Sequence, residues 1–591
     1  MLFRELSEYY KKLEGTSSRL SMMDILAELF KKASAAEIDK IVYMTQGVLA
    51  PPFEGVEFGL AAKMAEDSIA IASGYTKQEI EKEYQKSGDL GTTAEKFLTE
   101  SKLKRMASET YTVLEVYSTM LKISKASGPG SKDIKTRLLA SLIAASSPLE
   151  SRYLVRYPLG QLRLGAGDST MLEALSVMST GERKLKEPLE RAYNICSDLG
   201  LVAKALADGG ESRIKRFNVM LFKPIRPALA ERLPTPELIL EKMHGKCSVE
   251  QKYDGFRCQI HKKGAMIKIY SRRLEDITEM FPDIAKATID EVKADSIIFE
   301  GEALAYNEAT GEYMQFQETI QRKRKHSIKE KIEELPLHLM AFDIMYLNGE
   351  DMLNHTYESR RAKLEVLLKN GEIIMPAKRI MATTPKDLDE FFQKSIGDGL
   401  EGIVAKDLQA HYIAGARKFS WIKMKRSYRG ELSDTLDLVI IGYYSGHGSR
   451  AEFQFGGLLG AVYNKKRDMF ETVSRIGTGF TEKQMTELKE MLSSIQVKSK
   501  PARVDSLVEP DFWVYPKYVI TVRADEITRS PMHTCGRSKD KDGIESGYAL
   551  RFPRLVGDTA IRSDKGPEDA TETSEVIEMY NGQRKVRLED K

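Results

Sequence analysis

The spacing of apolar residues changes twice along this chain, and that change constrains the fold more than any other feature. Up to about residue 215, apolar residues recur every three or four positions, as in amphipathic helices, with almost no alternating strand pattern. Helices are expected at 21–33, 36–45, 58–73, 77–86, 93–107, 109–124 and 133–145. Residues 1–215 are therefore predicted to form an all-α domain.

Strands and helices mix in the middle of the chain. An extended stretch with two prolines, at 222–230, marks the start of this mixed pattern of strands and helices. The expected strands are 247–253, 256–262, 266–271, 296–306, 337–347, 402–406 and 421–425, and the expected helices are 282–292, 357–369 and 385–395. Residues 216–428 are therefore predicted to form an α+β domain built on antiparallel sheets.

The last part of the chain is mostly strand-like. Strands are expected at 437–444, 455–463, 470–476, 513–524 and 547–555, with one helix at 481–492. A small closed β-barrel of the OB type fits this pattern. Residues 429–591 are predicted to be this third domain, which makes the chain a multidomain protein.

Composition narrows the class of protein. The 591 residues carry a formal net charge of +3, and no apolar run reaches the length of a membrane span. The N-terminus lacks the pattern of a signal peptide, so a cytoplasmic protein with no membrane partner is expected. The cysteines Cys196, Cys247, Cys258 and Cys535 are scattered. This argues against a zinc site or disulfides and favours buried free thiols.

One octapeptide, 250–257, carries a candidate nucleophile. Its Asp-Gly turn lies between two β-like stretches and predicts a hairpin, with Lys252 at a strand end and Cys247 able to face Cys258 across it. A lysine that faces a cavity can attack an electrophile if its surroundings favour the neutral amine. A plain hairpin with a solvated lysine fits the same residues, so the octapeptide alone does not decide.

Candidate partners for Lys252 follow at intervals along the chain. They lie in the stretches 271–273, 299–306, 341–347, 401–406 and 417–425. Alternation at period two places Lys423 and Lys425 on one strand face. Glu302 and Glu401 lie on separate strands, and such a pair suits Mg²⁺ when phosphate oxygens and water complete the shell. Ordinary surface acids are the alternative.

The order and spacing of these stretches resemble the nucleotidyltransferase motifs of ATP-dependent DNA ligases of the archaeal and eukaryotic replicative type. The resemblance covers the whole chain. Residues 128–131 and 160–165 are similar to stretches of the family's DNA-binding domain, and 562–565 keeps the Arg-x-Asp-Lys form of its last motif. It implies a helical DNA-binding domain, an adenylation domain and an OB-fold domain.

The resemblance also implies a role for each candidate residue. Lys252 would attack the α-phosphate of ATP and carry AMP, while Glu302 and Glu401 would hold Mg²⁺. The cofactor-binding residues would be Glu250 and Phe342 at the adenine, Arg257 and Glu302 at the ribose, Lys423 at the α-phosphate, and Arg272 and Arg417 at phosphates of nucleotide or DNA.

A DNA ligase of this type would act on nicked double-stranded DNA in replication, repair and recombination. The AMP would pass to the 5′-phosphate, and the 3′-hydroxyl would then displace it. The OB-fold domain would swing on a hinge near 426–434, with 562–565 orienting the pyrophosphate. A nucleoid-associated monomer with a sliding clamp as partner is expected, although no convincing clamp-binding motif is visible in the first domain.

Several alternatives stay open at this point. RNA-capping enzymes and RNA ligases share the lysine motif but lack the long helical domain, and a non-catalytic DNA-binding scaffold is formally possible. The basic run 321–326 fits either DNA-backbone contact or a solvated loop. The turn at 128–131 could bind phosphate with help from Lys132 and Lys135, or simply start a helix.

Overall fold

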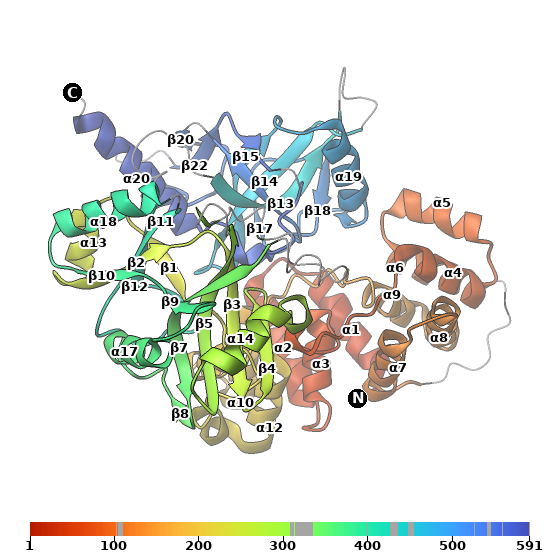
Figure 1. Ribbon diagram of the computed structural model, residues 1–591. Coiled ribbons are helices and arrows are strands. Elements are labelled where there is room, and N and C mark those ends of the chain that lie inside the picture. Colours follow the sequence, from red (N-terminus) through yellow and green to blue (C-terminus); the bar gives the residue numbers. More distant parts are fainter. Residues whose placement is uncertain are drawn as a thin grey trace.

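The computed structural model describes residues 1–101, 103, 110–307, 312–313, 319, 335–398, 400–425, 435–446, 454–524, 526–539, 545–557 and 560–589. Three successive regions follow one another along the chain, as the changes in apolar spacing predict. In Figure 1 a helical region lies on the right, an α/β region on the left and a β-rich region above them.

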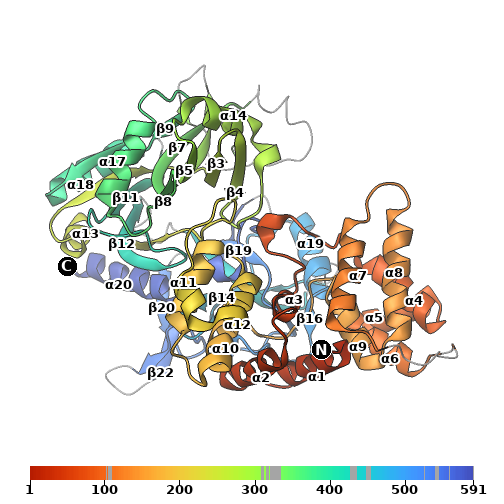
Figure 2. The same ribbon diagram turned by 90° about the horizontal axis from the view of Figure 1, so that it is seen from below.

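The helical region forms because its apolar residues fall on single helix faces that pack together. Its helices are α1 (Phe3–Glu14), α2 (Arg19–Lys32), α3 (Ile38–Gln46), α4 (Ala62–Ser73), α5 (Lys77–Ser87), α6 (Leu90–Thr99), α7 (Val113–Lys125), α8 (Ser131–Ala145), α9 (Pro148–Arg156), α10 (Asp168–Thr180), α11 (Lys186–Cys196) and α12 (Leu199–Lys215). Leu6, Leu26, Ile41 and Leu139 belong to its fully buried core. Figure 2 shows α4 to α9 gathered at one end of this region.

Helix α4 starts later than its apolar spacing predicts, and the reason removes one candidate phosphate contact. Lys135 of α8 is only 8% exposed, and its ammonium donates to the carbonyl oxygens of Phe58 and Gly59 at 2.9 and 3.1 Å. These bonds hold the chain before α4 in an irregular path. Because the ammonium of Lys135 is already engaged, the structure favours the plain helix start at 128–131 over a phosphate site that Lys135 assists.

The α/β region contains two sheets. One has the strand order β1-β12-β11-β2-β10, and the other β4-β3-β5-β7-β8 with β6 and β9 at its sides. The strands are β1 (Leu229–Arg232), β2 (Cys247–Lys252), β3 (Phe256–Lys263), β4 (Met266–Ser271), β5 (Ser296–Asn307), β6 (Glu312–Tyr313), β7 (Leu337–Leu347), β8 (Glu350–Asp351), β9 (Ile374–Pro376), β10 (Arg379–Ala382), β11 (Gly402–Lys406) and β12 (Arg417–Lys425). The helices are α13 (Pro236–Lys242), α14 (Pro282–Glu291), α17 (Tyr357–Leu367) and α18 (Pro385–Gly397).

The hairpin predicted around Lys252 is wrong. Strand β2 pairs with β10 and β11, whereas β3 pairs with β4 and β5, so the Asp-Gly turn carries the chain from one sheet to the other. A Cβ atom at Gly255 would collide with the carbonyl oxygen of Ala303. The glycine is thus needed for a close backbone approach. Cys247 and Cys258 consequently lie in different sheets, although both are buried free thiols as expected.

The β-rich region has the strand order β16-β18-β13-β14-β15-β17, with β19 beside β13 and β23 beside β19, and a second sheet β20-β22-β21. Its elements are β13 (Thr435–Tyr444), β14 (Gly457–Asn464), β15 (Met469–Ile476), α19 (Glu482–Ser493), β16 (Gln496–Val497), β17 (Val504–Asp505), β18 (Phe512–Val514), β19 (Val519–Arg523), β20 (Glu526–Ser530), β21 (Ser538–Lys539), β22 (Glu545–Arg551), β23 (Arg554–Leu555) and α20 (Thr573–Glu589). The predicted strand 513–524 is two strands that pair with β13 at different places.

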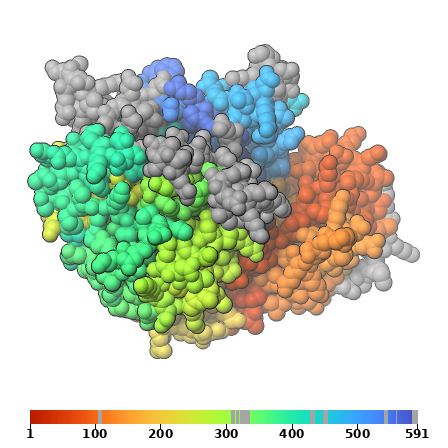
Figure 3. Space-filling view, viewed as in Figure 1, coloured from red at the N-terminus to blue at the C-terminus, as the bar shows by residue number. Residues whose placement is uncertain are grey.

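In the space-filling view the helical region lies directly beside the α/β region (Figure 3). Within the described part of the chain, no helix is long and apolar enough to cross a membrane. The expected hinge at 426–434 and the basic run 321–326 lie outside the described residues.

Candidate active site

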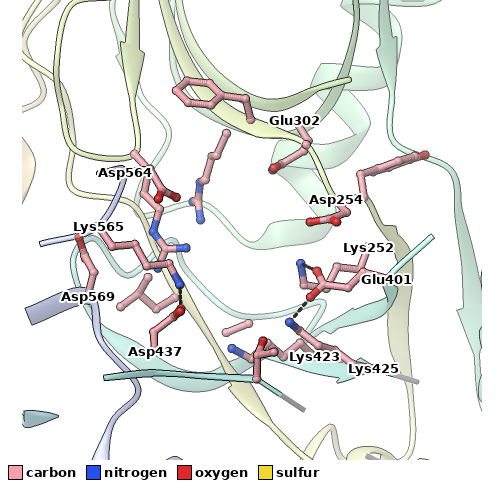
Figure 4. Close-up of a pocket in the computed structure, with 18 of the residues that line it drawn as sticks. Lys252, Asp254, Glu302, Glu401, Lys423, Lys425, Asp437, Asp564, Lys565 and Asp569 are labelled. Carbon is pink, nitrogen blue, oxygen red and sulfur yellow. Dashed lines mark hydrogen bonds and ion pairs between the residues drawn. The ribbon is translucent and has the colours of Figure 1, made fainter. Parts of the chain in front are cut away.

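A cavity of about 830 Å³ lies between the two sheets of the α/β region and the facing β-rich region. Every residue that the sequence nominates lines it: Glu250, Lys252, Arg257, Arg272, Glu302, Phe342, Glu401, Arg417 and Lys423. Figure 4 shows Lys252 and Glu401 on one wall and Lys565 and Asp564 on the opposite one. The structure therefore brings together residues that are far apart in the sequence.

Lys252 ends β2 and forms an ion pair with Glu401 (Figure 4). The pairing of β2 with β11 sets this geometry, because Gly402 lies opposite Lys252 and the Glu401 amide donates to the Lys252 carbonyl at 3.1 Å. Lys425 pairs with the same carboxylate. Burial would raise the pKa of Glu401, but attraction to the two lysines outweighs it and holds that pKa well below its ordinary value.

Glu302 is the second nominated acid of the cavity, and its ionised form is less favoured than that of Glu401. Burial raises the pKa of Glu302 to about 7, and repulsion from Asp254 and Glu401 adds to this shift while Lys252 and Arg257 oppose it. The carboxylates of Glu302, Asp254 and Glu401 all line the cavity. Their mutual repulsion leaves a place where a cation would be stabilised.

Strand β5 carries two acids with different tasks. Arg257 lies opposite Glu302 in the strand register, yet its guanidinium bonds Glu300 at 2.7 and 3.2 Å and the carbonyl of Ala228 at 2.9 Å. Glu300 is 1% exposed and also accepts from Tyr412 at 2.7 Å. Glu300 therefore fixes Arg257, and Glu302 remains directed at the cavity.

Glu250 and Phe342 both line the cavity, and the Glu250 carboxylate belongs to a buried network. The Glu250 carboxylate accepts from Tyr357 at 2.5 Å and Arg361 at 2.9 Å, and pairs with Lys406 at 2.7 Å. Phe342 meets Trp421 edge to face, with ring centroids 5.9 Å apart. Helix α17, which supplies Tyr357 and Arg361, is more than 100 positions from Glu250 in the chain, so no sequence pattern links them.

Arg417 and Lys423 of β12 are engaged by Glu575 in the first turn of the C-terminal helix α20 and by Glu572 just before it. Arg417 pairs with Glu575 at 2.5 Å and with Glu572 at 3.3 Å, and Lys423 pairs with Glu575 at 3.3 Å. Burial lowers the pKa of Lys423 to about 7, although attraction to Glu575 opposes that shift. The C-terminal acids thus bind two cations that the sequence assigns to phosphate. The composition of the charged C-terminal tail does not predict these contacts.

The opposite wall is built by the last motif. Lys565 pairs with Asp437 (Figure 4), and Arg562 pairs with Asp564 at 2.7 Å. Arg273, next to the candidate Arg272, donates to the carbonyl of Ser563. The β-rich region therefore presents residues 562–565 to the same cavity that contains Lys252.

The carboxylates suit a hard divalent cation. Glu302 and Glu401 offer oxygen ligands, which Mg²⁺ prefers, and a cation would offset the burial and the carboxylate repulsion that raise the pKa of Glu302. In the described ranges no group of three histidine, cysteine or acidic side chains is close enough to hold a metal by itself. The residues therefore fit Mg²⁺ as two ligands of a shell that water completes, and phosphate oxygens would join this shell when nucleotide binds.

A lysine with carboxylate and cationic neighbours, in a cavity between an α/β region and a β-rich region, is the arrangement expected of a nucleotidyltransferase. Comparison with known proteins narrows this class. Residues 2–176 match the family model "DNA ligase N terminus", 227–425 match "ATP dependent DNA ligase domain", and 451–565 match "ATP dependent DNA ligase C terminal region". The chain belongs to the ATP-dependent DNA ligase family and is a DNA ligase.

Relatives resemble the chain from end to end. A "Probable DNA ligase" of Dictyoglomus turgidum is 48% identical over 590 residues, which cover 100% of this chain and 99% of the relative. The "DNA ligase" of Saccharolobus solfataricus is 42% identical, and the match covers 100% of this chain and 99% of the relative.

A solved structure matches part of the chain. The structure of a mycobacterial DNA ligase D complexed with ATP and MES covers 58% of this chain and 97% of its own, with 22% identity and a TM-score of 0.34. The family assignment decides against an RNA-capping enzyme or an RNA ligase.

Proposed function

We propose that this ligase seals nicks in duplex DNA through a covalent adenylate on Lys252. The Lys252 nitrogen attacks the α-phosphorus of ATP, an N–P bond forms and pyrophosphate leaves. An oxygen of the DNA 5′-phosphate then attacks the same phosphorus and releases the lysine. Finally the 3′-hydroxyl attacks the 5′-phosphorus, closes the phosphodiester and expels AMP. The observation that carries this proposal is the position of Lys252 in a cavity lined by all the other nominated residues.

The residues around Lys252 support this chemistry. Glu401 holds the lysine amine in place through its ion pair, and the amine loses a proton before it attacks. Glu302 and Glu401 would hold Mg²⁺, which would neutralise these carboxylates and the phosphates. Lys423 would contact the α-phosphate and Arg417 a phosphate of nucleotide or DNA, in place of their present partner Glu575.

The other nominated residues would orient the nucleotide. Glu250 and Phe342 would bind the adenine, and Arg257, fixed by Glu300, would hold the ribose with Glu302. Arg272 would meet phosphate, and residues 562–565 would orient the pyrophosphate, because they already face the cavity.

We also propose how the domains divide this work. Residues 1–215 would bind DNA, 216–428 would carry out adenylation, and 429–591 would form an OB-fold domain that swings on the hinge 426–434. We further propose that the protein acts in replication, repair and recombination as a nucleoid-associated monomer with a sliding clamp as partner; the family assignment supports its action on DNA.

Labelling of the protein with nucleotide tests the central step. Incubation with α-labelled ATP and Mg²⁺ should leave label on the chain through denaturation, and Lys252→Ala should abolish it. Lys262→Ala is a matched control, because Lys262 is a buried lysine that caps α14 outside the cavity. Label retained by Lys252→Ala would refute the assignment, and a wild-type chain that never takes label would indicate a non-catalytic scaffold.

A further inference from the structure

Lys406 is a buried cation to which the ligation steps above give no role. It ends β11 and is 1% exposed. Its ammonium pairs with Glu250 at 2.7 Å and donates to the carbonyl oxygen of Phe342 at 3.0 Å. It lies 4.9 Å from the centroid of the Phe342 ring and 4.1 Å from that of Trp421. One ammonium group therefore contacts both proposed adenine-binding residues.

Lys406 is not needed to balance the charge of Glu250. One carboxylate oxygen of Glu250 already accepts from Tyr357 and Arg361, and Lys406 binds the other oxygen. Burial lowers the pKa of Lys406, and the pairing with Glu250 opposes that shift. Removal of the ammonium would leave Glu250 paired with Arg361 but free to rotate its second oxygen. The specific contribution of Lys406 is therefore the orientation of this carboxylate.

The orientation of the carboxylate has a chemical consequence at the cavity that Glu250 lines. Adenine presents an amino group at its six-position, which donates a hydrogen bond, whereas guanine presents an oxygen there, which accepts one. A carboxylate oxygen accepts from the first and repels the second. A fixed oxygen discriminates between the two bases more strongly than one that can turn away.

We propose that Lys406 is a positioning residue that sets the base selectivity of the adenylation step. It holds the Glu250 carboxylate at a constant place relative to the Phe342 ring, through one bond to each residue. The proposal rests on the nucleotide site proposed above.

Competition between nucleotides tests this role. The rate of labelling by α-labelled ATP is measured in the wild type and in Lys406→Met, with unlabelled GTP as competitor. The variant should show a KM for ATP raised about tenfold, a smaller change in kcat, and a ratio of GTP inhibition constant to ATP KM that falls about tenfold or more. An unchanged ratio would overturn the proposal, because a merely structural lysine lowers activity without changing the choice of base.

Three further variants keep the test decisive. Lys262→Met removes another buried lysine, which bonds the carbonyls of Thr288 and Val292, and should leave the ratio unchanged. In a Glu250→Gln background, Lys406→Met should change the ratio little further, and fully additive effects would contradict action through Glu250. If Lys406→Met fails to fold, Lys406→Gln is used instead, because glutamine keeps a hydrogen-bond donor of similar reach. Its ratio of GTP inhibition constant to ATP KM should be lower than that of the wild type but still favour ATP. A ratio equal to that of the wild type would overturn the proposal. Label on the wild type separates failure of this proposal from failure of the ligase mechanism.

Discussion

At the scale of single residues, acidic and basic side chains lie close together in a partly buried cavity, and the pKa of Glu302 is shifted as a result. Its pKa is raised to about 7 from an ordinary value of 4.5, chiefly by burial. Between these two values the folded chain binds a proton at Glu302 that the unfolded chain has lost. Glu302 therefore contributes stability below about pH 4.5, and this contribution is lost as the pH rises through 7.

A divalent cation should reverse that trend, because it binds the ionised carboxylate and competes with the proton. We expect Mg²⁺ to raise the melting temperature more at pH 8 than at pH 6, with nucleotide absent. The Glu302→Gln variant should lose most of this pH dependence. Glu291→Gln is the control: Glu291 accepts hydrogen bonds from the backbone N–H groups of Ile373 and Ile374, and its variant should keep the pH dependence. Equal Mg²⁺ shifts at both pH values in the wild type would count against Glu302 as a ligand.

At the scale of elements, the chain between β2 and β3 depends on one glycine. Gly255→Ala would drive a Cβ atom into the Ala303 carbonyl, and overpacking of this kind destabilises a fold by about 1–3 kcal/mol. We expect this loss in urea unfolding. Gly397→Ala is the control, since it lies at the end of α18 with nothing within 4 Å of its Cβ position and should be near neutral. Equal stability of the two variants would show that the turn relaxes.

The Asp-Gly turn also shows what the sequence could and could not predict. Turn residues between two strand-like stretches identify the ends of the strands. The same residues occur in a hairpin and in a connection between two sheets, so the sequence cannot tell which strands pair with β2 and β3. Lys252, Glu302, Glu401 and Lys423 could be nominated because each lies in a short motif. Arg361 and Tyr357 could not, because only the folded position of α17 brings them within hydrogen-bonding distance of Glu250.

Helix α20 is the element that most affects the phosphate-facing cations. Glu575→Gln should weaken its hold on Arg417 and Lys423 and leave both cations freer for phosphate. We expect a lower KM for ATP in the labelling reaction and a larger radius of gyration in solution scattering. Glu482→Gln on α19 carries the same change outside the cavity and should show neither effect. A compact variant with an unaltered KM would mean that these pairs do not hold the β-rich region in place.

At the scale of the whole molecule, the arrangement described places the β-rich region against the helical region as well as over the cavity. Ala502 lies at 3.0 Å from the Cβ position of Gly165, and Thr170 of α10 donates to Asp468 at 3.1 Å. Gly165 belongs to the stretch 160–165 that resembles a DNA-contacting part of the family. The same placement directs residues 562–565 at Lys252. The arrangement therefore suits reaction with ATP, and DNA would need the β-rich region to leave Gly165.

A reversible cross-link separates these two steps. Gly165→Cys with Ala502→Cys should form a disulfide after a small shift, because the β-carbons of a disulfide lie about 3.5–4.5 Å apart. The four native cysteines are buried, which limits side reactions. A residue other than glycine at φ +72° is strained, so the single variant Gly165→Cys serves as the stability control.

The oxidised double variant should still take label from ATP on Lys252 but bind nicked duplex DNA at least tenfold more weakly than the reduced form, as measured by gel shift at fixed salt, because affinity for DNA depends strongly on salt. Reduction should restore binding. The single cysteine variants should respond to neither oxidant nor reductant. If the oxidised form binds nicked DNA as tightly as the reduced form, the β-rich region does not have to leave Gly165 before DNA enters, and a rotation about 426–434 is not the step that admits the duplex.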